Sequence, residues 1–206
     1  MAIPLLSSKE YAHAMQLHPR QYEAFTYVAW GLNNAQISDI MAIQLKTTVN
    51  KLRDVLSIFH GSRMGISLNT LIYAPEVFAD KKAPSPIRDA LSNQRKVQVS
   101  VREHDYLIGV GNGLTYAEIQ KQYGHTATNI WQDAESTKSK FRTVTRQQTV
   151  IASLLSAVIT LEEIEFTTKF NQPEPLDLTA NPLPFAQIQD QQQVDSLQGA
   201  PAPGTC

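Results

Sequence analysis

One short segment occurs twice in the chain, and this repetition constrains the fold more than any other feature of the sequence. Residues 31–41 read GLNNAQISDIM, and residues 113–123, which lie 82 positions later, read GLTYAEIQKQY. Gly, Leu, Ala and Ile recur at the same places, and both copies end in a bulky apolar residue. Self-similarity at a fixed spacing indicates that one structural unit is built twice.

The residues around the first copy predict three short helices. Pro19 suits the first turn of a helix, where its missing N–H is no loss, and Gly31 is typical of the residue that ends one. Asn33 and Gln36 have the residue types and spacing of an N-terminal cap for a second helix. A break at 42–44 precedes a third helix, in which apolar residues recur at helical spacing: Val49, Leu52, Leu56 and Phe59.

The second copy carries the same signals. Ser100 with Glu103, and Thr115 with Glu118, form capping-box patterns, and Thr126 is suited to cap the third helix. A longer apolar helix is expected over residues 147–165. Because no alternating apolar and polar pattern typical of strands occurs, the sequence predicts an all-α protein.

Composition divides the chain into four parts. Residues 74–96 contain three prolines, which argue against one continuous helix, although Ser85–Leu91 fits a short one. Residues after 170 are rich in Pro, Gln and Ala and have few bulky apolar side chains, which is typical of disorder. We therefore expect a first unit at 1–73, a linker at 74–96, a second unit with a long last helix at 97–170, and a disordered tail at 171–206.

The overall charge and cysteine content narrow the functional classes. The 206 residues carry a net charge of −1, so binding to nucleic acid requires a local basic patch. Cys206 is the only cysteine, which excludes an internal disulfide framework and a cysteine-based zinc site. No apolar run approaches the length of a membrane span, and residues 1–10 lack the pattern of a signal peptide. We expect a cytoplasmic protein that has no membrane partner.

Enzymatic signals are absent from the sequence. The five histidines are scattered, no glycine-rich phosphate loop follows a strand, and Cys206 lies in the predicted tail. The sequence therefore predicts a protein that is not an enzyme, with no catalytic residues, no cofactor and no metal site.

Helix, glycine, short capped helix, tight turn and polar-faced helix follow one another in the order of a helix-turn-helix unit. Residues 17–59 and 99–141 both resemble the LuxR/NarL-type (GerE-like) DNA-binding domain, and together they cover roughly half of the chain. The resemblance implies two tandem four-helix units. The first copy matches the family pattern at Leu17, Pro19, Arg20, Glu23, Gly31, Leu32, Asn34, Ile37, Lys46, Thr47 and Leu52, and the second at Val99, Glu103, Gly113, Leu114, Glu118, Ile119, Thr126 and Ile130.

In that family the third helix of the unit enters the major groove of duplex DNA. The resemblance therefore implies a transcriptional regulator that reads DNA mainly through its first unit. Trp131, Asp133 and Glu135 replace basic residues or histidine of the family pattern in the second unit, which weakens DNA binding there. The residues implied to contact DNA are Asn34, Lys46, Thr47, Val49, Asn50, Lys51 and Arg53 in the first unit, and Thr128, Asn129 and Gln132 in the second.

A second interpretation stays open. The helix-turn-helix scaffold is also suited to an adaptor that binds RNA polymerase or another transcription regulator, without sequence-specific DNA contact. The family's last helix dimerises, so the resemblance also implies packing of this helix between the two units or between two chains of a homodimer. The candidate residues for a protein interface are Trp131, Val150, Leu154 and Val158.

Overall fold

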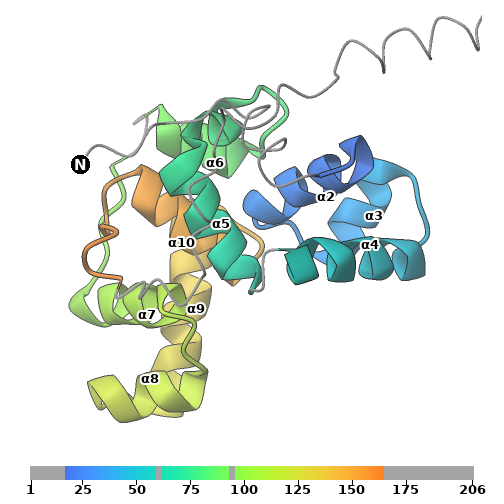
Figure 1. Ribbon diagram of the computed structural model, residues 1–206. Helices are drawn as coiled ribbons and strands as arrows, with labels where there is room; N and C mark the ends of the chain where they lie inside the picture. The colour runs from blue at the N-terminus through green and yellow to red at the C-terminus, as the bar shows by residue number, and fades with distance from the viewer. Residues whose placement is uncertain (1–16, 59–61, 93–95, 165–206) are drawn as a thin grey trace, which may run out of the picture. The chain divides into compact units, whose positions relative to one another are not determined.

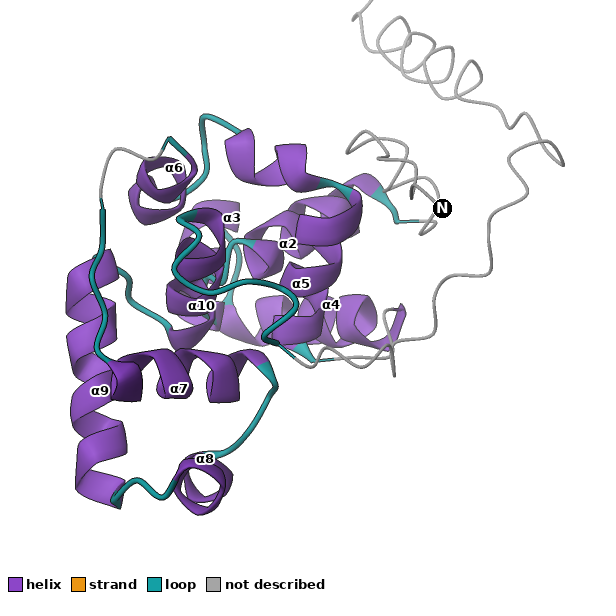
Figure 2. Ribbon diagram, turned by 90° about the vertical axis from the view of Figure 1, so that its left-hand side faces the viewer, coloured by secondary structure: helices purple, strands orange, loops and turns teal. Residues whose placement is uncertain are grey.

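A computed structural model describes residues 17–58, 62–92 and 96–164. Within these ranges every regular element is a helix (Figure 2), which confirms the prediction of an all-α fold for this part of the chain. None of the described helices combines the length and the apolar character needed to cross a membrane.

The first repeat contains four helices. They are α2 (Pro19–Ala29), α3 (Asn34–Met41), α4 (Leu45–Ile58) and α5 (Arg63–Tyr73) (Figure 1). Helix α2 packs against α4 and α5, and α3 packs against α4.

The second repeat contains four helices in the same order. They are α7 (Val101–Gly111), α8 (Tyr116–Tyr123), α9 (Ala127–Phe141) and α10 (Arg146–Leu155). Helix α7 packs against α8, α9 and α10, and α8 packs against α9. Helices α7, α8 and α9 begin 82 positions after α2, α3 and α4 respectively. The repeat seen in the sequence is therefore a repeat of helix boundaries.

The backbone at the helix ends also repeats. Gly31 has φ 72° and Gly113 has φ 76°, in the left-handed region that glycine occupies at low cost. The short turn before the third helix is left-handed in both copies, at Ala42 in the first and Gly124 in the second. The predicted caps are confirmed: Asn33, Ser100, Thr115 and Thr126 each accept a hydrogen bond from a backbone N–H in the first turn of their helices.

Residues 74–92 of the segment that the sequence predicts to be a linker are a folded part of the core. They form a 3-10 helix, η1 (Pro75–Ala79), and the predicted short helix, α6 (Ser85–Leu91). Phe78 and Ile87 are fully buried, and the indole Nε1 of Trp30 donates a 2.8 Å hydrogen bond to a backbone oxygen of η1. Three prolines interrupt the helices here, but the apolar residues between them are enough to hold the segment against the rest of the unit.

The last described helix is shorter than the sequence predicts. Helix α10 ends at Leu155, and Ala157 adopts a left-handed conformation with φ 53°. The Val158 N–H donates to the Ser153 oxygen at 2.9 Å, as in a Schellman turn, so the apolar run continues after a reversal. Ile164, beyond this turn, is buried so close to Gly111 that a Cβ there would lie 2.7 Å from the Ile164 side chain.

The predicted disordered tail at 171–206 lies outside the described residues. The same holds for Phe59, which the sequence assigns to the third helix of the first unit, and for Cys206.

Candidate nucleic-acid interface

Helix α4 has one buried face, which determines the face that it presents outward. Thr48, Leu52 and Val55 are 1%, 2% and 0% exposed. Residues at spacings of three, four and seven share one face of a helix, so these three side chains anchor α4 against α2 and α3. Among the described residues, the opposite face of α4 is exposed.

The outward residues form a continuous strip, which we call the α4 ridge: Lys46, Val49, Asn50 and Arg53. All four are exposed, and Val49 has 38% of its surface accessible. All four are residues that the sequence predicts to contact DNA. Ser57, four residues beyond Arg53, extends the ridge and is also exposed. Helical spacing alone would have found Ser57.

Two other predicted contacts lie beside the ridge. Thr47 is exposed, while Lys51 is half-buried because its position is closer to the packed face of α4. The side chain of Lys51 therefore lies at the edge of the α4 ridge and is not part of it.

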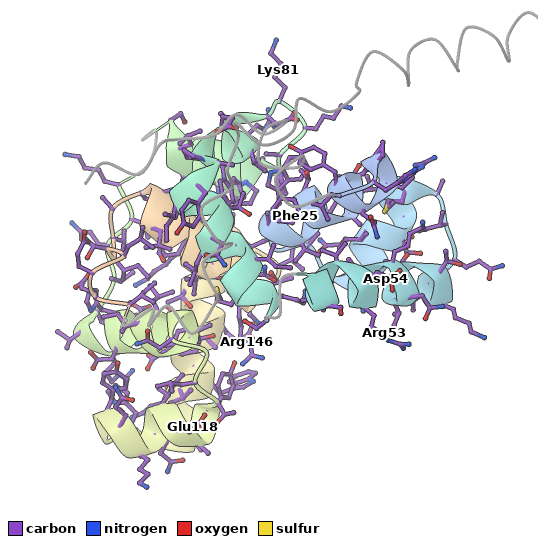
Figure 3. All side chains as sticks on the ribbon, viewed as in Figure 1. Phe25, Arg53, Asp54, Lys81, Glu118 and Arg146 are labelled. Carbon is purple, nitrogen blue, oxygen red and sulfur yellow. The ribbon has the colours of Figure 1, made fainter. Side chains whose placement is uncertain are left out.

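The α4 ridge carries unpaired positive charge. Within the described ranges, no ion pair or side-chain hydrogen bond engages Lys46, Lys51 or Arg53. Figure 3 shows the Arg53 side chain directed away from the body of α4. Asp54 is the only exposed carboxylate on the same helix.

Asn34 has an intramolecular role that the sequence reasoning missed. Its side-chain oxygen accepts a 2.8 Å hydrogen bond from Nη1 of Arg63, the first residue of α5, and the same guanidinium donates to the Leu32 backbone oxygen. Arg146, the first residue of α10, lies over the ring of Tyr116, 5.1 Å from its centroid. Because Tyr116 occupies the position of Asn34 in the second repeat, an arginine ties the fourth helix to the second in both copies.

The corresponding face of α9 is different in charge. Its exposed residues Thr128, Gln132 and Glu135 take the places of Lys46, Asn50 and Arg53, and we call them the α9 ridge. Asn129 is half-buried. Trp131 replaces Val49 and is 61% exposed. The α9 ridge and Trp131 together therefore offer hydroxyl, amide, carboxylate and aromatic groups but no cation.

Asp133 does not face outward, contrary to the sequence-based reasoning that placed its carboxylate against DNA. It is 3% exposed, and Nη2 of Arg102 on α7 donates a 3.2 Å hydrogen bond to its Oδ1, which makes the two side chains an ion pair. Burial raises the pKa of Asp133, although the Arg102 charge acts in the opposite direction. The only exposed carboxylate on this helix is Glu135.

Two lysines of α9, Lys138 and Lys140, form ion pairs within the protein. Nζ of Lys138 lies 2.7 Å from Glu135, and Nζ of Lys140 lies 2.6 Å from the buried Glu103. Burial opposes ionisation of Glu103, but hydrogen bonds from Lys140, Ser136 and the Ser100 N–H overcome it and lower its pKa to about 2. These contacts hold α7 to α9.

Among the predicted protein-interface residues, Val150 does not lie on the surface. It is 0% exposed, inside the core where α10 packs against α6 and α7. Leu154 and Val158 are half-buried and pack against the same core. Trp131 is the one residue of this set that is exposed.

The N-terminus of α10 joins the second repeat to the first. The Thr145 hydroxyl donates to the Gly31 oxygen at 2.6 Å. Nε2 of Gln147 lies 2.7 Å from the Val28 oxygen and 2.6 Å from the Ser67 hydroxyl. We call these contacts the α10 joint. The two repeats are therefore connected by side-chain hydrogen bonds in addition to the covalent backbone.

Comparisons of the chain with protein-family models, with curated proteins and with solved structures gave no match.

Proposed function

We propose that this chain is a transcriptional regulator with two helix-turn-helix units of the LuxR/NarL type, which binds duplex DNA mainly through the first. The observation that carries the proposal is the α4 ridge, where exposed cations that have no ion-pair partner among the described residues lie on the third helix of a repeat. The order α2, α3, α4 with a tight left-handed turn at Ala42 supports it.

The charge of the exposed residues favours the first unit as the one that binds duplex DNA. Duplex DNA presents closely spaced phosphates, so cations that are not neutralised by the protein contribute most of the non-specific affinity. Lys46 and Arg53 are exposed and form no ion pair with any residue that the structure describes. In the second unit the equivalent positions hold Thr128 and Glu135, which contribute no attraction to phosphate.

The test is a binding assay on the full chain with a random-sequence duplex at several salt concentrations. The double variant Lys46→Ala, Arg53→Ala should bind more weakly, and the slope of log K against log salt should fall by about 1.8 if both side chains neutralise a phosphate. Lys81→Ala is the matched control, because Lys81 is exposed and lies in the 74–96 segment, away from α4 (Figure 3). Its slope should match the wild type. An unchanged slope in the double variant excludes α4 from DNA.

The exposed Trp131 favours a second function, that of an adaptor for a protein of the transcription machinery. The same assay separates the two. A regulator binds duplex DNA at low salt and keeps its affinity in Trp131→Ala. An adaptor shows no duplex binding that depends on Lys46 and Arg53.

A further inference from the structure

The α4 ridge contains an apolar feature that phosphate binding does not use. Val49 is 38% exposed and Leu45, four residues earlier on the same side of the helix, is 51% exposed. Both lie in the N-terminal half of α4, the part of a helix-turn-helix recognition helix that contacts base edges. A cationic ridge gains no phosphate affinity from two aliphatic side chains.

Asn50 stands next to Val49 in the sequence and is exposed on the same ridge. An amide side chain pairs with the N6 and N7 atoms of adenine in the major groove, and an aliphatic side chain packs against the thymine C5-methyl group. Both groups lie on the major-groove edge of one A·T pair or of neighbouring pairs. The adjacent amide and aliphatic side chains on α4 match this pattern of donors, acceptors and methyl groups.

We propose that the α4 ridge reads A·T base pairs in the major groove, with the Asn50 amide on adenine and the Val49 methyl groups, flanked by Leu45, on thymine. This inference rests on the proposed DNA-binding function and gives its sequence preference. Lys46 and Arg53 at the two sides of the pair hold the helix to the groove.

The second repeat is not assigned the same reading. Gln132 offers the same amide chemistry as Asn50, but Glu135 lies on the same ridge and repels phosphate. Trp131 also replaces the aliphatic side chain by a large aromatic one. The preference for A·T therefore belongs to α4.

The experiment starts with selection of binding sites by the full chain from a duplex library randomised over about 20 base pairs, which spans two turns of DNA. The selected duplex is then remade with deoxyuridine in place of each thymidine in turn, which removes only the C5-methyl group. At one or more positions affinity should fall about three- to fivefold, the effect of losing one buried methyl contact. 7-Deaza-adenine near that position, which lacks N7, should weaken binding by about tenfold.

Protein variants assign each effect to a side chain. Val49→Ala should bind the thymine and uracil duplexes equally, and Asn50→Ala should lose the response to 7-deaza-adenine. Val101→Ala is the matched control, because Val101 is 79% exposed on α7 and lies outside the α4 ridge, and it should keep both responses. Circular dichroism confirms that each variant is folded.

Two results overturn the inference in different ways. If wild type binds the selected duplex through Lys46 and Arg53 but responds to neither uracil nor 7-deaza-adenine, the DNA-binding function stands and the A·T reading fails. If no duplex is bound at low salt, the proposed function fails and the A·T reading fails with it.

Discussion

Replacing Gly31 or Gly113 with alanine offers a matched measurement of the α10 joint. The two glycines occupy the same place in the two repeats and have nearly the same φ, 72° and 76°. A Cβ at Gly113 meets nothing within 4 Å, whereas a Cβ at Gly31 would lie 2.7 Å from the backbone nitrogen of Gln148. The backbone strain is therefore common to both variants, whereas only Gly31→Ala brings a Cβ into contact with α10.

The magnitudes follow from these distances. Alanine in the left-handed region costs about 1 kcal/mol, which is the whole effect expected for Gly113→Ala. In Gly31→Ala the N-terminus of α10 must also move, since a backbone atom cannot rotate away as a side chain can. That movement adds overpacking of about 1–3 kcal/mol and weakens the hydrogen bond from Thr145 to the Gly31 oxygen, which contributes about 1 kcal/mol. We expect a total loss of about 3–5 kcal/mol.

The assay is urea unfolding of the full chain, followed by far-ultraviolet circular dichroism, with wild type and both variants under the same conditions. The difference between the two variants, about 2–4 kcal/mol, measures the joint with the glycine effect subtracted. Equal losses in the two variants would refute the reasoning, because they would show that the second repeat does not bear on Gly31.

Two further predictions concern the polar contacts. Because the folded pKa of Glu103 is about 2, below its unfolded value of 4.5, its stabilisation is present above pH 4.5 and is lost as the pH falls toward 2. Glu103→Gln should therefore cost about 2 kcal/mol at pH 7 in urea unfolding, with a difference from wild type that shrinks below pH 4.5; a difference independent of pH would contradict the assignment. Gln147→Leu keeps the side-chain volume but leaves the Val28 oxygen without this donor, and should cost about 2 kcal/mol of unfolding free energy. The control Gln132→Leu, at an exposed position, should change stability by less than about 0.5 kcal/mol, and equal losses in both variants would argue against the joint.

Local features of the sequence determined most of the helix boundaries. Asn33, Ser100 and Thr115 cap their helices through hydrogen bonds to residues three positions away, so the sequence alone contains both partners of each bond. The left-handed glycines Gly31 and Gly113 likewise mark helix ends through their own backbone preference. Helical spacing placed Leu52 on the inner face of α4, as the structure has it, but it placed Val49 there as well, where the structure instead buries Thr48 and Val55. The residues of the outward α4 ridge came from the family resemblance.

Tertiary structure decided which charged groups are left for a partner. Asp133 and Lys140 look available on a helical wheel, but Arg102 and Glu103, more than thirty positions earlier, pair with them. In the same way, residues 74–92 are held in the core by a hydrogen bond from the distant Trp30. The α10 joint depends on the distant oxygens of Val28 and Gly31. Short-range chemistry sets where a helix begins and ends, since its partners are a turn away, while burial and ion pairing depend on residues that only the folded chain brings together.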